Sequence, residues 1–455
     1  MYNTRTASEN SREGVKEISN SKLMLFAFSV AFFPRLLSYF GAPSIINLAH
    51  LFIVPAAACI VLLTSKARHR QQISIAWELI FAMGIFFAVM VASALINDAG
   101  EINVCLQFLL QSEPYIFLLA LMSISFSKES FIEFRRWILR FCTFNLVLAL
   151  VQSILLPIGL YPRRGGTIAD NTAGVFASGR GSAGNYVSCT VSVYFALYLF
   201  SLKSIPLWLR IAALLASVYQ VYVSDSKQVF LAFAAGWILL VLTKAKEPGK
   251  MLSYTISIAI LLILFWWALY RFEFMTPYLN WIDRPGLYGP DGEATQTKIA
   301  AFRIIPSYFE SPLNHFFGLG PGHGVTRLGG WMMKKYAALL LPIGATIHPA
   351  PEEIFKVITD GWIAQESTIF FPLFTWAGIW GEVGLLGLAA YLHLASVVWR
   401  KICIDDFGKF MISSTVILGF ALTQMEEPGH MLTLACLLAL RWHERRLRQD
   451  DVAQT

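Results

Sequence analysis

The chain has 455 residues, of which 56% are hydrophobic and 14% are charged, and its mean hydropathy is +0.57. Because soluble domains carry about 25% charged residues, this composition excludes an ordinary soluble protein and predicts one surrounded largely by lipid. The formal charge is +7, but the basic residues lie in short clusters between apolar runs. That pattern orients membrane spans and does not indicate a nucleic-acid partner.

Six cysteines lie inside or beside apolar runs, without a CxxC pair or metal-ligand spacing, so we expect them to be packing residues. The sequence also lacks an HExxH motif, paired aspartates and a GxSxG elbow. These features predict neither a metal site nor a cofactor. The polar residues 1–21 lead directly into a long apolar run, which predicts that no signal peptide is cleaved.

The apolar runs predict an all-α polytopic membrane protein, because a helix needs about 20 apolar residues to cross a bilayer. With both termini placed in the cytoplasm, most basic residues of the short connections fall inside. The predicted order is a cytoplasmic tail (1–21), nine spans (22–271), a long outside loop (272–366), a returning segment with three spans (367–441) and a cytoplasmic tail (442–455). The twelve apolar runs are 22–40, 44–64, 74–96, 103–125, 138–159, 184–202, 206–223, 227–243, 252–270, 379–399, 408–425 and 429–441.

Four basic residues lie in short outside connections, where orientation selects against them: Arg163, Arg164, Arg180 and Lys227. Arg180 sits among glycines directly before a span, where backbone amides favour an anion such as a diphosphate. Arg163 and Arg164 have an alternative role, because arginines at a span end also reach lipid phosphates. Lys227 has a structural alternative in an ion pair with Asp225.

Polar residues within the predicted spans, such as Arg35 and Glu113, are functional hypotheses by default. The alternative, which we favour, is that they pair with one another to hold the bundle together. The last predicted outside turn contains Glu426 and Glu427 before a proline and a glycine.

The long outside segment, 272–366, is expected to be functional, because long loops in compact proteins are mostly functional or disordered. From Thr297 to Phe309, apolar residues recur with helical spacing, which predicts an amphipathic helix at the surface. Lys298 and Arg303 would project from its polar parts. A glycine-rich turn at 318–324 follows, without the features of a nucleotide-binding loop.

Residue types that suit sugar chemistry gather in this segment. Cations bind a lipid-linked diphosphate, aromatic rings stack on sugars, and a carboxylate or histidine accepts the proton of an acceptor hydroxyl. This combination suits glycosyl transfer from a polyprenyl-diphosphate sugar at the outer face of the membrane. The candidate bases are Glu366, His348 and His323, and the candidate stacking rings are Trp281, Tyr288, Trp331 and Trp362.

Three short motifs resemble the superfamily of O-antigen polymerases, exopolysaccharide polymerases and O-antigen ligases. The turn between two spans at 221–228 resembles the Asp-Ser-Lys-Gln turn of some polymerases. Lys298, followed by the glycine-rich 317–322, resembles the family's basic residue about twenty positions before a Gly-x-Gly-x-Gly. The segment 380–387, which contains Glu382, resembles the family's Glu-x-Gly-Leu-x-Gly return into the membrane. The likeness covers about residues 180–400.

The resemblance implies a metal-independent, inverting transferase with a C-type glycosyltransferase architecture. It implies that Arg180, Lys227 and Lys298 contact diphosphate, and it makes Glu382 a further substrate-binding candidate. Ligases of this superfamily carry a histidine eleven residues before the glycine of the returning segment, whereas this chain has Leu373 there. That departure favours a polymerase and leaves the general base unassigned, with Glu366 preferred.

The implied partners are a lipid-linked oligosaccharide, acting as donor and as acceptor, the membrane lipids and a chain-length regulator. The implied location is the bacterial cytoplasmic membrane. Two alternatives stay open, a ligase-type transferase and a flippase or transporter for lipid-linked glycans. Intramembrane charges favour a transporter, whereas the lack of an internal repeat and the long outside segment argue against one.

Overall fold

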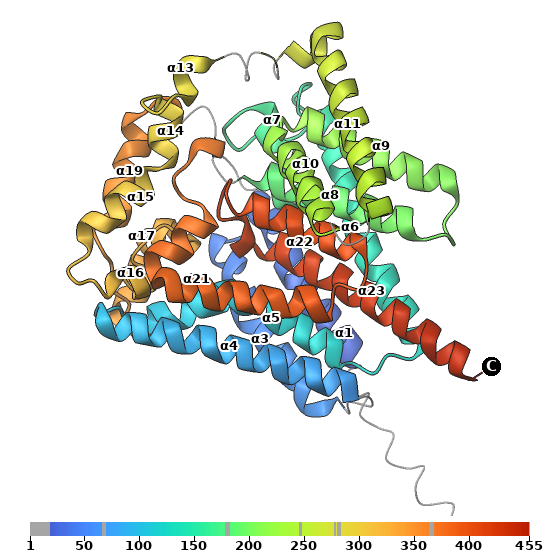
Figure 1. Ribbon diagram of the computed structural model, residues 1–455, viewed down its shortest axis with the longest axis horizontal. Helices are drawn as coiled ribbons and strands as arrows, with labels where there is room; N and C mark the ends of the chain where they lie inside the picture. Colours follow the sequence, from blue (N-terminus) through green and yellow to red (C-terminus); the bar gives the residue numbers. More distant parts are fainter. Residues whose placement is uncertain are drawn as a thin grey trace, which may run out of the picture.

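The computed structural model describes residues 19–65, 70–177, 183–244, 248–276, 279, 284–363 and 368–454. All regular secondary structure in these ranges is helical, and seven helical segments there are long and apolar enough to cross a membrane. The chain is therefore a helical, multi-pass membrane protein (Figure 1). The seven segments are α1 and α2 (Asn20–Phe32 and Pro34–Tyr39), η1 and α3 (Ser44–Leu48 and His50–Thr64), α4 (Arg70–Ile96), α5 (Glu101–Ser123), α6 (Lys128–Leu155), α11 (Pro248–Arg271) and α21 (Thr375–Lys401).

The five other predicted spans coincide with helices outside this set of seven, so the twelve-span topology stays a prediction. One of them ends earlier than expected, because α22 stops at Leu418 and not at residue 425. A Cβ at Gly419 would lie 2.4 Å from the Met425 sulfur, so the chain turns closely there and 419–427 becomes a connecting loop. The five helices are α8 (Gly184–Ser201), α9 (Leu207–Val223), α10 (Lys227–Leu242), α22 (Asp406–Leu418) and α23 (Pro428–Gln454).

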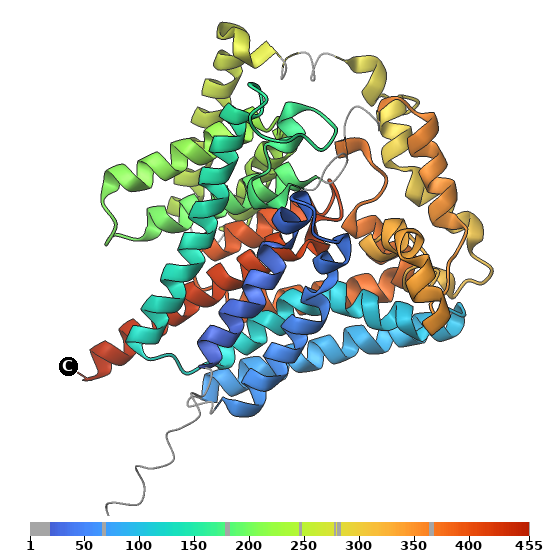
Figure 2. The ribbon, with the colours of Figure 1, turned by 180° about the vertical axis from the view of Figure 1, so that it is seen from behind.

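The helices of the first third of the chain pack against the C-terminal helices. Figures 1 and 2 show α4 and α21 side by side, and α5 lies between α3, α4 and α23. Aromatic side chains fill the core of this bundle, for example Phe28 stacked on Phe32 and Phe86 against Tyr391. The bundle thus brings the first span beside the loop that precedes α23, although almost 400 residues separate Arg35 from Glu427.

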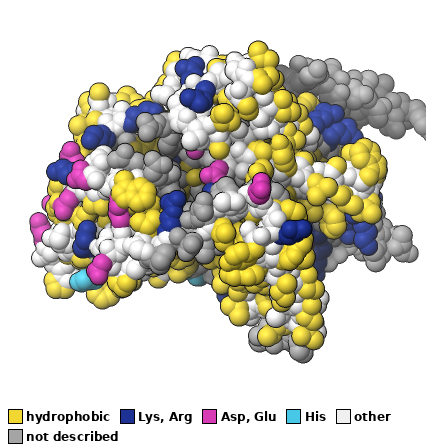
Figure 3. Space-filling model, turned by 90° about the horizontal axis from the view of Figure 1, so that it is seen from above, with side chains coloured by type: hydrophobic (Ala, Val, Ile, Leu, Met, Phe, Trp, Pro, Cys, Tyr) yellow, Lys and Arg dark blue, Asp and Glu magenta, His cyan; other side chains and the backbone are white. Residues whose placement is uncertain are grey.

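Residues 284–363, which we name the loop block, fold into short helices that lie to one side of the bundle, at the left of Figure 1. Most of the acidic side chains visible in Figure 3 gather over this side. The helix predicted from Thr297 to Phe309 is present in pieces: it is interrupted at Ile299 and changes to a 3-10 helix at Ile305. The main helices of the block are α13 (Pro285–Tyr288), α14 (Glu293–Lys298), α15 (Ala300–Ile304), α16 (Asn314–Phe317), α17 (Met333–Lys335), α18 (Ala337–Leu340) and α19 (Ala350–Asp360).

The glycine-rich turn at 318–324 fastens the loop block to α21. The amides of Leu319 and Gly320 donate to the carbonyls of Gly381 and Glu382, each at 2.9 Å. A Cβ at Gly318 would lie 2.4 Å from the Glu382 carbonyl carbon, and φ is +71° there, so only glycine permits this approach. Two of the three motifs that carry the family resemblance therefore meet in space.

Candidate functional site

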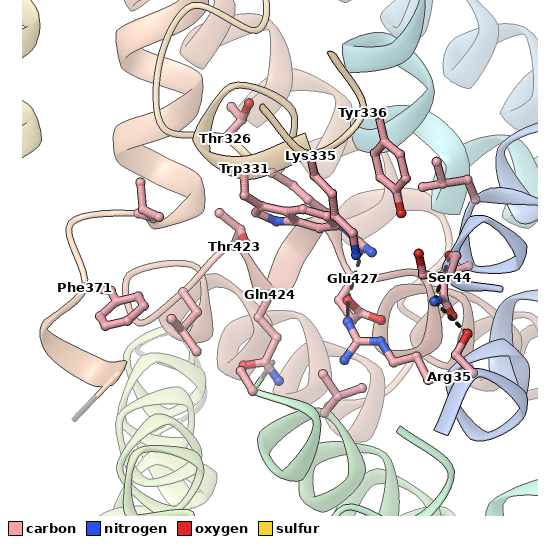
Figure 4. Close-up of a pocket in the computed structure, with 18 of the residues that line it drawn as sticks. Arg35, Ser44, Thr326, Trp331, Lys335, Tyr336, Phe371, Thr423, Gln424 and Glu427 are labelled. Carbon is pink, nitrogen blue, oxygen red and sulfur yellow. Dashed lines mark hydrogen bonds and ion pairs between the residues drawn. The ribbon is translucent and has the colours of Figure 1, made fainter. Parts of the chain in front are cut away.

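A cavity with five charged side chains in its lining opens where the first span, the loop block and the loop 419–427 meet. It has a volume of about 590 Å³. Figure 4 shows Trp331, Lys335 and Tyr336 of the loop block facing Glu427 and Arg35 across it. We name it the cationic cavity, because its described lining includes four basic side chains and one carboxylate: Arg35, Arg164, Arg327, Lys335 and Glu427.

Glu427 is held between two arginines. Its Oε2 pairs with Nη2 of Arg35 and, at 3.0 Å, with Nη1 of Arg327. Burial raises the pKa of Glu427, but Arg35 and Arg327 outweigh burial and hold that pKa below its usual range. The carboxylate is therefore ionised at neutral pH. Both intramembrane residues singled out from sequence have partners within the bundle, but not each other: Arg35 pairs with Glu427, and Glu113 lies 2.7 Å from Nδ1 of His50.

Arg327 is placed by a chain of contacts that begins at Glu382. This fully buried carboxylate accepts the Thr326 hydroxyl at 2.5 Å and the Thr326 amide at 3.0 Å. The next amide, that of Arg327, donates to Glu426 at 2.7 Å, and the guanidinium donates to the Glu426 carbonyl at 2.9 Å. Glu382 does not line the cavity. Its contacts are with the turn that precedes Arg327, and its role as a substrate ligand stays a prediction.

Aromatic rings flank the cations of the cavity. The Trp331 ring contacts two of them: the Arg327 guanidinium carbon and the Lys335 ammonium nitrogen each lie 5.6 Å from its centroid. Arg164 donates from Nε and Nη2 to the Tyr39 carbonyl at 3.1 and 2.7 Å. Two of the residues predicted from sequence, Arg164 and Trp331, are therefore brought to one cavity.

The sequence predicted that Lys298 projects from the polar part of a surface helix. In the structure its side chain is instead enclosed by protein groups and does not line the cavity. Its ammonium donates to the carbonyls of Ile369, Phe371 and Ala421 at 2.9 to 3.0 Å and sits 4.3 Å from the Phe374 ring centroid. Burial lowers the pKa of Lys298 to about 7. Because Phe371 lines the cavity and the loop 419–427 forms its floor, Lys298 fastens two of its walls together.

The two candidate histidine bases do not line the cationic cavity. The rings of His323 and His348 stack with centroids 5.3 Å apart. The ring nitrogens of His323 contact the Leu319 carbonyl at 2.9 Å and the Thr346 hydroxyl at 2.8 Å. Both nitrogens thus have protein partners, and the pair holds the glycine-rich turn in place.

The remaining predicted residues are dispersed. Lys227 pairs with Asp225 at 2.8 Å, which is the structural alternative raised from sequence. Arg303 donates to Gln296 at 3.1 Å beside a separate groove, and Arg163 is exposed and does not line the cavity. Arg180, Glu366 and Trp281 lie outside the described residues.

No model of a known protein family matches the chain, and no curated protein is significantly similar to it.

The sequence did not single out Arg327, Lys335 or Glu427 as site residues, and for Arg35 it favoured a structural role. The adjacent acids of the last outside turn were a usable signal, since two carboxylates before a span need cationic partners. Arg327 and Lys335 lie in a long loop, where the orientation rule does not apply and a basic residue carries no information.

The histidine stack should make the loop block sensitive to acid. Burial lowers the pKa of His348 to about 4, helped by His323, and burial also lowers the pKa of His323. The pKa of a histidine in an unfolded chain is about 6.5. Between that pH and about 4, His348 therefore binds a proton in the unfolded state but not in the folded state, which favours unfolding.

We therefore expect thermal stability to fall as the pH drops from 7 to 5. His348→Phe keeps a ring in the stack without a titrating group and should reduce this fall. Melting curves of both proteins at the two pH values measure the effect, and equal falls would contradict the assignment.

Proposed function

We propose that this chain is a polysaccharide polymerase that joins polyprenyl-diphosphate-linked oligosaccharide units at the outer face of the bacterial cytoplasmic membrane. The observation that carries the proposal is the cationic cavity, whose lining holds three arginines, a lysine and aromatic rings, and in which Arg35 and Arg327 pair with the ionised carboxylate of Glu427. The resemblance of three motifs to the polymerase and ligase superfamily supports the same conclusion.

The charge of the cavity suits a diphosphate leaving group. Arginine forks match phosphate oxygens and remain charged at every physiological pH. Because the cavity lies where candidate membrane helices meet the loop block, a polyprenyl chain can stay in lipid while its diphosphate reaches Arg35, Arg164 and Arg327. Trp331, Tyr336 and Tyr39 supply ring faces for the attached sugar.

Glu427 is the residue that we assign as general base. The acceptor hydroxyl oxygen attacks the anomeric carbon of the donor sugar, and the bond from that carbon to the diphosphate oxygen breaks. The diphosphate leaves with the bonding electron pair and is stabilised by the arginines. The hydroxyl proton passes to the Glu427 carboxylate. Attack opposite the leaving group inverts the anomeric centre, and the step consumes no cofactor.

The direct test uses purified protein in lipid nanodiscs and lipid-linked repeat units extracted from cells that lack this chain. We expect a ladder of lipid-linked oligomers and released polyprenyl diphosphate. Repeat units that stay unjoined in this assay, together with movement of the units across vesicle membranes that contain the protein, would instead establish a flippase.

Arg163 and Arg164 provide a matched pair of neighbours. Arg164 lines the cationic cavity, whereas Arg163 does not. Because each lost contact to the developing charge weakens transition-state binding, Arg164→Ala should lower the transfer rate by about tenfold or more. Arg163→Ala should retain close to the rate of the unmodified protein. Rates in the nanodisc assay decide the point, and equal losses in the two variants would show that Arg164 has no specific role.

A further inference from the structure

A second hollow lies on the loop block, between α14, α15 and α19. We name it the outer groove; it has a volume of about 940 Å³ and is lined by Glu293, Gln296, Arg303, Glu353, Asp360 and Trp362, among others. Nothing in the transfer chemistry uses it.

The outer groove and the cationic cavity are both lined in part by helix α19 of the loop block. On α19, Glu353, Lys356, Val357 and Asp360 recur at helical spacing and face the groove, whereas Phe355 lines the cavity. A ligand that extends out of the cavity over this helix would reach the groove.

Trp362 presents an exposed aromatic surface in the groove. Its side chain is 49% exposed, yet the backbone on either side of it is tied down. The Ile363 amide donates to Glu293 at 3.2 Å, and a Cβ at Gly361 would lie 3.0 Å from the same carboxylate. Because the backbone beside the ring is anchored, only the side-chain torsions of Trp362 lose freedom when a ligand stacks on it, which keeps the entropy cost of binding small.

The polar groups of the groove are also held by protein contacts. The Tyr308 hydroxyl donates to Glu353 at 2.7 Å, and Arg303 donates to Gln296 at 3.1 Å. Each retains further acceptor or donor capacity, because a carboxylate offers about four lone-pair sites and a guanidinium five N–H groups. The groove therefore offers donors and acceptors in fixed positions beside a ring face.

The charge of the groove is opposite to that of the cavity. Its described lining has three carboxylates, Glu293, Glu353 and Asp360, against Arg303 and Lys356. This excess of acceptors disfavours a phosphate-rich ligand. It suits an uncharged or amino-bearing oligosaccharide, whose hydroxyls need both donors and acceptors and whose ring faces stack on tryptophan.

We propose that the outer groove binds the oligosaccharide of the growing chain, away from its diphosphate. The inference rests on the proposed function, since that function supplies the glycan. The cavity then takes the charged end of the lipid-linked substrate, and the groove takes sugars further along it.

The first test measures sugar binding without transfer. Purified protein in nanodiscs is applied to an array of bacterial surface oligosaccharides, and dissociation constants are measured for the members that bind. Trp362→Ala should weaken binding about tenfold, and Trp362→Phe should restore part of it. Asp360→Asn should also weaken binding. Glu352→Gln, which alters an exposed acid on α19 outside the groove, and Trp208→Ala, which removes an exposed ring on α9, should bind as the unmodified protein does.

The second test measures product length in the transfer assay. Trp362→Ala should still join two repeat units but should release shorter polymers. Unchanged sugar binding in Trp362→Ala and Asp360→Asn, or no array member bound above empty nanodiscs, would overturn the groove assignment while leaving the proposed transfer intact. If the unmodified protein binds sugar through Trp362 but joins no repeat units, the groove stands and the polymerase proposal falls.

Discussion

Arg327→Ala is expected to lower glycan transfer by about 10²- to 10³-fold, which is the effect of removing one preorganised donor from a developing anion. The guanidinium is 6% exposed, pairs with Glu427 at 3.0 Å and stacks against Trp331. Arg327 belongs to the loop block, and its amide and guanidinium both donate to Glu426 of the loop 419–427, which fixes its position. Initial rates in nanodiscs measure the loss.

The same substitution also leaves Glu427 with one partner fewer, and breaking a buried ion pair costs about 3–5 kcal/mol of stability. Arg327→Lys keeps the charge but loses the fork that binds two phosphate oxygens, so it should fold and still lose about tenfold or more in rate. Arg400→Ala, on an exposed arginine of α21, serves as the matched control. A well-folded Arg327→Lys or Arg327→Ala protein with full activity would remove the cavity from the reaction.

Glu427→Gln is expected to lower transfer by about 10²- to 10⁴-fold, because an amide of the same shape cannot accept the hydroxyl proton. The substitution also removes a negative charge from beside Arg35 and Arg327. Binding of inorganic pyrophosphate should therefore be unchanged or tighter in the variant. Loss of turnover with retained pyrophosphate binding separates a base from a residue that only holds the arginines.

Two measurements accompany this substitution. Glu310→Gln, on an exposed acid of the loop block, should leave both turnover and pyrophosphate binding unaltered. Because the arginines hold the pKa of Glu427 below its usual range, transfer by the unmodified protein should lose activity with acid only below that range. Turnover in Glu427→Gln equal to that of the unmodified protein would exclude Glu427 as the base.

Much of the helical organisation was predictable. Each apolar run predicted from sequence falls on a helix, because a bilayer leaves the backbone no polar partners except its own. Helical spacing also predicted the pieces of helix from Thr297 to Tyr308. The end of α22 was not predictable from sequence. The chain turns at Gly419 because it packs against Met425 and Trp376, and hydropathy does not record these packing contacts.

The site was predicted only in part. Arg164 was selected because it breaks the orientation rule, and Trp331 because its ring is one of four in the long segment that could stack on a sugar. Lys298 was selected as a diphosphate ligand but holds three backbone carbonyls, and Glu382 was selected as a ligand but accepts three backbone amides and a hydroxyl. From sequence alone, a charged residue that hydrogen-bonds to backbone groups cannot be distinguished from one that binds a substrate.

The amino-acid sequence by itself determined a helical membrane protein with one long polar segment, because hydropathy and helix length act locally along the chain. Only the tertiary structure decided that Arg35, Arg164, Arg327 and Glu427 share one cavity. Arg35 meets Glu427 only because helix packing brings together residues almost 400 positions apart, and Arg327 reaches the same carboxylate from the loop block. No spacing rule in the sequence predicts which buried charges will pair.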